Sequence, residues 1–252
     1  MELDITTFLI VCPLVFLGGF VDSIAGGGGL ITLPAYLIAG LPPHYAIATN
    51  KLSAAIGSGV SVYRLWRGSF VHFTFLMPAI VAAIIGAAVG SQLLLVMDEI
   101  YLQYLLLIIL PITAFYVLRK KSYDDKIREV PHSRAITTAI SFVLSAYCGF
   151  YGPGTGAFLI LVLISWAGMN VRTAAGSAKV INVAANFAAL AVLMLSGKVL
   201  VTLGLVAAAF GMAGNYIGSG MLIHKGATII RPIIIFVLAI FFAKVIYDMF
   251  VI

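Results

Sequence analysis

Charged side chains are scarce in this sequence. Only 10% of the 252 residues are charged, with 15 Lys and Arg against 9 Asp and Glu. Apolar residues make up 62%, and the mean hydropathy is +1.13. Because a bilayer span needs about 20 mostly apolar residues, and apolar runs fill nearly the whole chain, a soluble domain is excluded. The composition predicts an all-α integral membrane protein.

Cysteines are few and common cofactor motifs are absent, and each of these features limits the range of possible functions. The two cysteines, Cys12 and Cys148, lie in apolar stretches, which predicts buried free thiols that say nothing about the redox compartment. No Walker sequence, zinc-ligand spacing or dinucleotide fingerprint occurs, so we expect no cofactor and no metal. The net charge of +6 comes from bases in short loops, where membrane orientation explains them better than nucleic acid does.

Ten apolar segments can be drawn, and two of them are short. As a helix, segment 28–41 would reach about 21 Å of a hydrocarbon core about 30 Å thick. Either the short segments cross, which gives ten crossings, or they are re-entrant, which gives eight. The segments are 5–22, 28–41, 45–66, 72–97, 100–118, 134–151, 156–169, 173–195, 199–223 and 229–251.

A shift of 128 positions superimposes the two halves. It places Lys51 on Lys179, and Gly90-Ser91 on Gly218-Ser219. Duplication is a common way to build transporters, so we expect a polytopic helical bundle of two five-segment inverted repeats. The expected repeats are residues 1–118 and 134–252, and a charged cytoplasmic loop, 119–133, joins them.

The basic residues predict the orientation. The central stretch "RKKSYDDKIREVPHSR" should be cytoplasmic, because Lys and Arg concentrate in inner loops. Ten crossings then place both termini outside in a multi-pass protein of a prokaryotic cell membrane. Eight crossings would give parallel halves with the acidic N-terminus inside.

Four consecutive glycines interrupt the stretch "GGFVDSIAGGGGLITLPAYLIAGL". Unwound backbone at membrane depth is tolerated only in protein or beside a watery cavity, and the N–H groups that it exposes at a helix start bind anions. "GFYGPGTGAF" has the same pattern in the second half, and close helix packing is the alternative explanation. The candidate substrate-binding residues in these breaks are Gly26, Gly27, Gly28, Gly29, Gly152, Gly154, Thr155 and Gly156.

Lys51 and Lys179 lie six or seven residues inside their spans. An intramembrane lysine costs about 2.5–3.5 kcal/mol at the bilayer centre, and such residues usually mark substrate paths. Snorkelling to the interface is the alternative. The two lysines and breaks could form two half-sites along the membrane normal or one shared site. The expected hydrogen-bond donors to substrate oxygens, which could instead join helices, are Asn50, Ser53, Ser177, Asn182 and Asn186.

Asp22 precedes the first glycine break and has two candidate roles. It could cap the exposed N–H groups of the short helix, or it could carry the proton that couples to anion movement. We favour the cap, because the matching position in the second half holds Phe150.

The stretches "GGFVDSIAGGGGLITLPAYL" and "ATNKLSAAIGS", with their degenerate second copy, resemble the sulfite exporter TauE/SafE family of membrane transporters. The resemblance covers essentially the whole chain and is strongest over residues 18–68. It implies a duplicated helical carrier of small sulfur-containing anions such as sulfite, sulfoacetate or other sulfonates, working as an exporter by alternating access.

The expected function is therefore transport, not catalysis, with a small oxyanion and the lipid bilayer as partners. A homo-oligomer is compatible with the sequence. An anion channel is the first alternative, since the same lysines could line a pore. An intramembrane serine protease, using Ser58 or Ser219 in the two "GSG" triplets, is the second.

Overall fold

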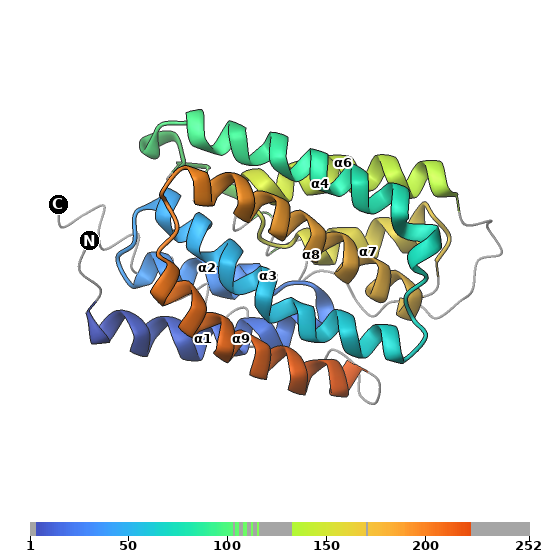
Figure 1. Cartoon of the computed structure of the whole chain (residues 1–252), viewed down its shortest axis with the longest axis horizontal. Coiled ribbons are helices and arrows are strands. Elements are labelled where there is room, and N and C mark those ends of the chain that lie inside the picture. Colours follow the sequence, from blue (N-terminus) through green and yellow to red (C-terminus); the bar gives the residue numbers. More distant parts are fainter. Residues whose placement is uncertain are drawn as a thin grey trace.

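The computed structural model describes residues 4–102, 104–105, 108–109, 112, 115, 133–169 and 171–222. This part of the chain is helical throughout and contains no strand (Figure 1). Segment 229–251 and most of 100–118 lie outside the described residues. The helices are α1 (Ile5–Ala25), α2 (Gly29–Ile38), α3 (Pro43–Arg67), α4 (Phe73–Val96), α6 (Arg134–Phe150), α7 (Thr155–Ser165), α8 (Val171–Leu195) and α9 (Val201–Leu222).

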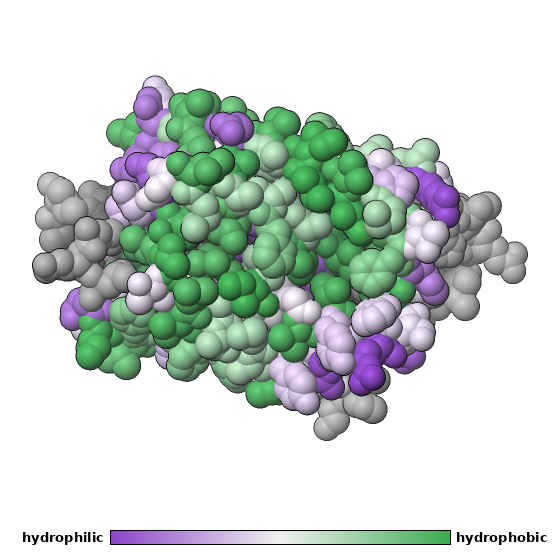
Figure 2. Space-filling model, in the orientation of Figure 1, coloured by the Kyte–Doolittle hydropathy of each residue, from purple (hydrophilic) through white to green (hydrophobic). Residues whose placement is uncertain are grey.

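Four of these helices, α1, α4, α8 and α9, are long and apolar enough to cross a membrane. Figure 2 shows a mostly hydrophobic middle, with hydrophilic residues gathered towards the two ends. Such a band is what a lipid-facing surface requires, because lipid solvates apolar side chains and not polar ones. The prediction of a polytopic helical membrane protein is confirmed.

The short helices are shorter than their predicted segments. α2 has 10 residues and α7 has 11, so each is about 15 Å long, about half the hydrocarbon thickness. Each helix begins within one residue of the predicted start, directly after a glycine-rich turn, and ends three or four residues earlier than predicted.

α3 is polar for a membrane helix and is buried at the centre of the bundle, against α8 and α9. Its buried polar side chains include Asn50, Lys51 and Ser58. Such residues are costly beside lipid, so they lie where other helices cover them. The predicted segment 45–66 is therefore a helix whose low hydropathy reflects its interior position.

Two pairs of helices pack closely in parallel. On α4, Gly86 meets the carbonyl of Phe142, and Gly90, one turn later, meets the carbonyl of Ala146 on α6. The residue numbers of the two helices rise together along this contact, so α4 and α6 run in the same direction. The small residues allow their backbones to touch. α1 and α9 pack in the same manner. Their contacts are Gly214 with Phe16 and Gly218 with Phe20.

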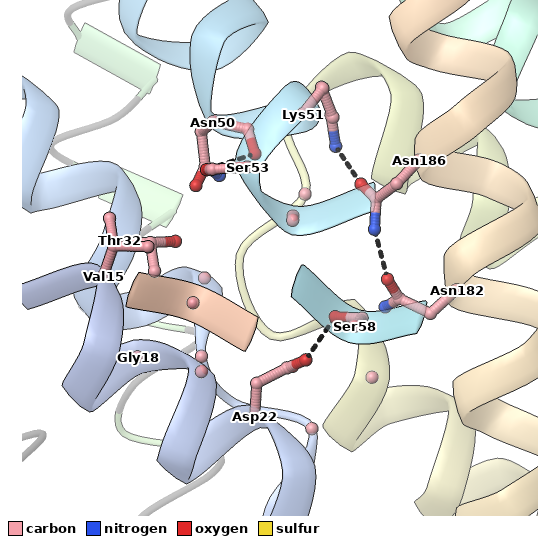
Figure 3. Close-up of a pocket in the computed structure, with 18 of the residues that line it drawn as sticks. Val15, Gly18, Asp22, Thr32, Asn50, Lys51, Ser53, Ser58, Asn182 and Asn186 are labelled. Carbon is pink, nitrogen blue, oxygen red and sulfur yellow. Dashed lines mark hydrogen bonds between the residues drawn. The ribbon is translucent and has the colours of Figure 1, made fainter. Parts of the chain in front are cut away.

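α3 and α8 run in opposite directions, because Lys51 on α3 reaches Asn186, whereas Ser58, further along α3, lies near Asn182 (Figure 3). α3 and α8, which the 128-residue shift matches, thus run antiparallel. Two inverted repeats would have this arrangement, and the duplication itself stays a prediction.

A candidate anion site where two glycine breaks meet

The two glycine breaks are in direct backbone contact. The carbonyl of Gly26 accepts a hydrogen bond of 3.0 Å from the N–H of Ala157 at the start of α7. A Cβ on Gly26 would lie 2.4 Å from the carbonyl carbon of Gly156, and a Cβ on Gly156 would lie 2.7 Å from the Gly26 oxygen. Only glycine fits both positions. The two breaks therefore meet at one point in the bundle.

A cavity of about 50 Å³ surrounds this crossing, large enough for a few water molecules. It brings together most of the residues that the sequence nominates, but Gly27, Thr155, Ser177 and Lys179 are not among its lining residues. The nominated residues that line it are Asp22, Gly26, Gly28, Gly29, Asn50, Lys51, Ser53, Gly152, Gly154, Gly156, Asn182 and Asn186.

Lys51 carries the positive charge of this cavity. Its side chain is buried, with 2% of the residue exposed. The ammonium donates to the carbonyl of Cys148 at 2.5 Å and to Oδ1 of Asn186 at 3.3 Å, and it lies 3.5 Å from the thiol of Cys148. No carboxylate in the described part of the chain forms an ion pair with it. The snorkelling interpretation is therefore wrong for Lys51, because its ammonium points into the protein.

Two asparagines on α8 extend the hydrogen bonding from this lysine. Asn186 accepts from Lys51 and donates through Nδ2 to Oδ1 of Asn182 at 2.5 Å. Both asparagines line the cavity, and Asn182 lies beside Ser58 on the opposite wall (Figure 3). The chain of bonds uses the oxygen of Asn182 and leaves its NH₂ group for a guest in the cavity.

The starts of α2 and α7 add backbone donors. Gly28 is the N-cap of α2 and Gly154 that of α7, and neither helix has a side-chain cap. Within the described residues, no hydrogen bond uses the N–H of Gly28, Gly29, Gly154 or Gly156, all of which line the cavity. Unused N–H groups at the positive end of a helix dipole favour an anion.

Asp22 does not cap α2, so that prediction is wrong. Its carboxylate forms an ion pair with Lys179 and accepts from Ser58 at 3.1 Å, while its carbonyl accepts from Lys179 at 2.9 Å. The lysine outcompetes the α2 N–H groups because a charged donor makes the stronger bond to a carboxylate. Lys179 lines a smaller neighbouring cavity, which it shares with Asp22, Gly156 and Asn182.

Ser53 does not serve as a donor to a guest. Its hydroxyl donates to the carbonyl of Asn50 at 3.1 Å and accepts from the hydroxyl of Tyr36 at 2.8 Å. A serine has one hydroxyl hydrogen, and this one is already used within the protein. Oδ1 of Asn50 is buried without a partner in the described part of the chain.

The sequence reasoning missed several lining residues. A signal was available for Cys148, which lies one helical turn before the break at Gly152, and for Gly18 and Gly19, one turn before Asp22. The remaining contacts depend on which helices pack together. The lining residues that were missed are Val15, Gly18, Gly19, Thr32, Ala54, Ser58, Cys148, Gly211 and Asn215.

Comparison with known proteins gives consistent matches. The family model for the sulfite exporter TauE/SafE matches residues 11–245. A probable membrane transporter protein of Haemophilus influenzae is 34% identical over 250 residues, covering 98% of both chains. Probable membrane transporter protein ORF9 of a Sinorhizobium species is also 34% identical, over 94% of this chain and 90% of its own.

A third relative, probable membrane transporter protein YfcA of Escherichia coli K12, is 33% identical over 92% of this chain and 87% of its own. No solved structure gives a significant match. With a family model that spans nearly the whole sequence and relatives that match over most of their length, the helical membrane protein described above belongs to the sulfite exporter TauE/SafE family of membrane transporters.

Proposed function

We propose that the protein is a carrier of small sulfur-containing oxyanions, sulfite or an organosulfonate, that binds them in the cavity at the glycine crossing. The observation that carries the proposal is the buried ammonium of Lys51, which has neutral partners only within the described residues. A buried charge without a counter-ion is costly, so it is retained where a passing ion supplies the missing charge.

The donors around the cavity suit an oxyanion in number and direction. Sulfite and a sulfonate group each present three oxygens, and the cavity offers the Lys51 ammonium, the amide of Asn182 and the N–H groups at the starts of α2 and α7. Hydrogen bonds to a charged acceptor are shorter and about twice as strong as neutral ones. Residues at the N-termini of both α2 and α7 line the cavity, so the two helix dipoles add to the same effect.

We further propose export by alternating access, with one half of the bundle moving against the other. The antiparallel course of α3 and α8, and the contact of the two breaks at the centre, are the features that an inverted-repeat carrier uses. The family description names an exporter of sulfite, and this supports both the anion class and the outward direction for the present chain.

The test is anion binding by purified wild type and by Lys51→Met. Methionine keeps most of the aliphatic bulk and removes the charge, so affinity for sulfite and sulfoacetate should fall about ten- to a hundred-fold, equivalent to about 1.5–3 kcal/mol. Lys198→Met is the matched control, because Lys198 lies over the ring of Tyr45 outside the cavity. Its affinity should equal that of wild type.

Equal affinities of wild type and Lys51→Met would contradict the proposed site. In proteoliposomes, counterflow and saturable uptake would support a carrier, whereas unsaturated current would indicate a channel instead. The serine protease alternative has no support in the described residues, where Ser58 donates to Asp22, Ser219 donates to the carbonyl of Tyr216, and His44 contacts other groups.

A further inference from the structure

The matched lysines of the two halves differ in the charge of their hydrogen-bond partners. Lys51 bonds to neutral oxygens, whereas Lys179 forms an ion pair with Asp22. The position that matches Asp22 in the second half is Phe150, so only one half supplies a carboxylate. An arrangement that served only to hold helices together would not need this difference in charge.

Asp22 lies on the wall between two cavities. It lines the central cavity together with Lys51 (Figure 3), and it also lines the smaller cavity, together with Lys179. Ser58 donates to the same carboxylate from α3. The residues of α2, α7 and α9 that line the two cavities carry no charge, and the titratable side chains lining them in the described chain are Asp22, Lys51, Cys148 and Lys179.

An anion beside Lys51 therefore shares its cavity with a carboxylate. Two like charges in a poorly hydrated space repel each other strongly. A proton on Asp22 would remove that repulsion, and it would also release the ammonium of Lys179 to face the anion. The cavities would then hold two ammonium groups without a carboxylate.

We propose that Asp22 takes up one proton from solvent when an anion binds, so that the protein carries the anion and the proton in the same direction. This inference rests on the proposed anion site. Linkage makes the effect reciprocal: the anion binds more tightly as pH falls, and the proton binds more tightly when the anion is present. An acidic outside would then oppose export. The anion's own gradient would drive export, and the membrane potential would add to it for a divalent anion, which leaves with one net negative charge.

The experiment measures binding of sulfoacetate to detergent-solubilised wild type between about pH 6 and pH 8, where both acidic groups of the ligand stay ionised. Affinity should rise towards tenfold for each unit that the pH falls, and a pH dye should record one proton taken up per anion bound. Asp22→Asn should bind tightly at every pH and take up no proton. The matched control is Asp98→Asn, at an exposed acid outside the cavities, which should behave as wild type.

Asp22→Asn with the pH slope and proton uptake of wild type would overturn the inference. Wild type that binds sulfoacetate with a flat pH profile and no proton uptake would also overturn the inference. If Lys51→Met abolished that binding, the proposed function would still hold without the proton coupling. Wild type that bound neither sulfoacetate nor sulfite would instead refute the proposed function. If Asp22→Asn does not fold, Asp22→Ser and the proton count on wild type decide the question.

Discussion

At the scale of single residues, the glycine crossing is the most demanding feature of the molecule. Gly156→Ala would place a Cβ 2.7 Å from the carbonyl oxygen of Gly26. The backbones would have to separate, at a cost of about 1–3 kcal/mol for overpacking. We expect a lower melting temperature and weaker anion binding, measured by thermal unfolding and by sulfite titration.

Gly59→Ala is the control for this change. Gly59 lies inside α3, and a Cβ there would have no neighbour within 4 Å. Alanine is favoured over glycine inside a helix by about 0.5–1 kcal/mol, so stability should stay the same or rise. If Gly59→Ala and Gly156→Ala lost the same stability, the crossing would not be tightly packed.

A second residue-scale prediction separates donors from structural hydroxyls. Asn182→Ala should weaken anion binding, because it removes an NH₂ group that faces the cavity. Ser53→Ala should leave affinity unchanged and lower stability by about 1–3 kcal/mol, because it leaves the buried hydroxyl of Tyr36 without its acceptor. Binding and unfolding measured on both variants test this. A larger loss of affinity in Ser53→Ala would show that the donor assignment is reversed.

At the scale of the helices, glycines with a packing role should behave differently from those at the crossing. A Cβ on Gly90 would lie 1.9 Å from the carbonyl oxygen of Ala146, in the seam between α4 and α6. Gly90→Ala should therefore lower the melting temperature, at a cost of about 1–3 kcal/mol, while the folded fraction keeps wild-type anion affinity. Reduced affinity in protein that is fully folded would place this seam in the binding machinery.

Much of the helical framework could be predicted from the sequence. Apolar length predicts the spans, and four glycines before "LITLPAYL" predict the break ahead of α2, because glycine is unfavourable inside a helix. The presence of Lys51 inside α3 indicates an interior helix, because a charged side chain is costly beside lipid. These are local properties, and a local pattern can reveal them.

Contacts between distant segments could not be predicted in this way. The ion pair between Asp22 and Lys179 joins residues 157 positions apart, and the bond from Lys51 to Cys148 joins residues 97 apart. Composition and periodicity say which face of a helix is polar, but not which partner faces it. Phe150 at the matching position favours a cap for Asp22, and no local pattern indicates Lys179 as its partner.

At the scale of the whole molecule, the charge distribution predicts the topology. The test introduces single cysteines, one beside Glu2 and one near Asp124, into a background without Cys12 and Cys148. An impermeant label is then applied from outside the cell. The position beside Glu2 should be labelled and the position near Asp124 protected, because inner loops hold the bases. Labelling near Asp124 in intact cells would refute the predicted orientation.

The hydrogen bond between Gly26 and Ala157 has a mechanical consequence for the whole molecule. It joins the two halves through backbone atoms alone, in addition to the α1–α9 and α4–α6 seams that also join them. In the proposed alternating access this contact would act as a fulcrum, and a tilt of one half about it that opens the cavity on one side would close it on the other. The crossing would then forbid a state open at both ends, and a leak would require this fulcrum to break.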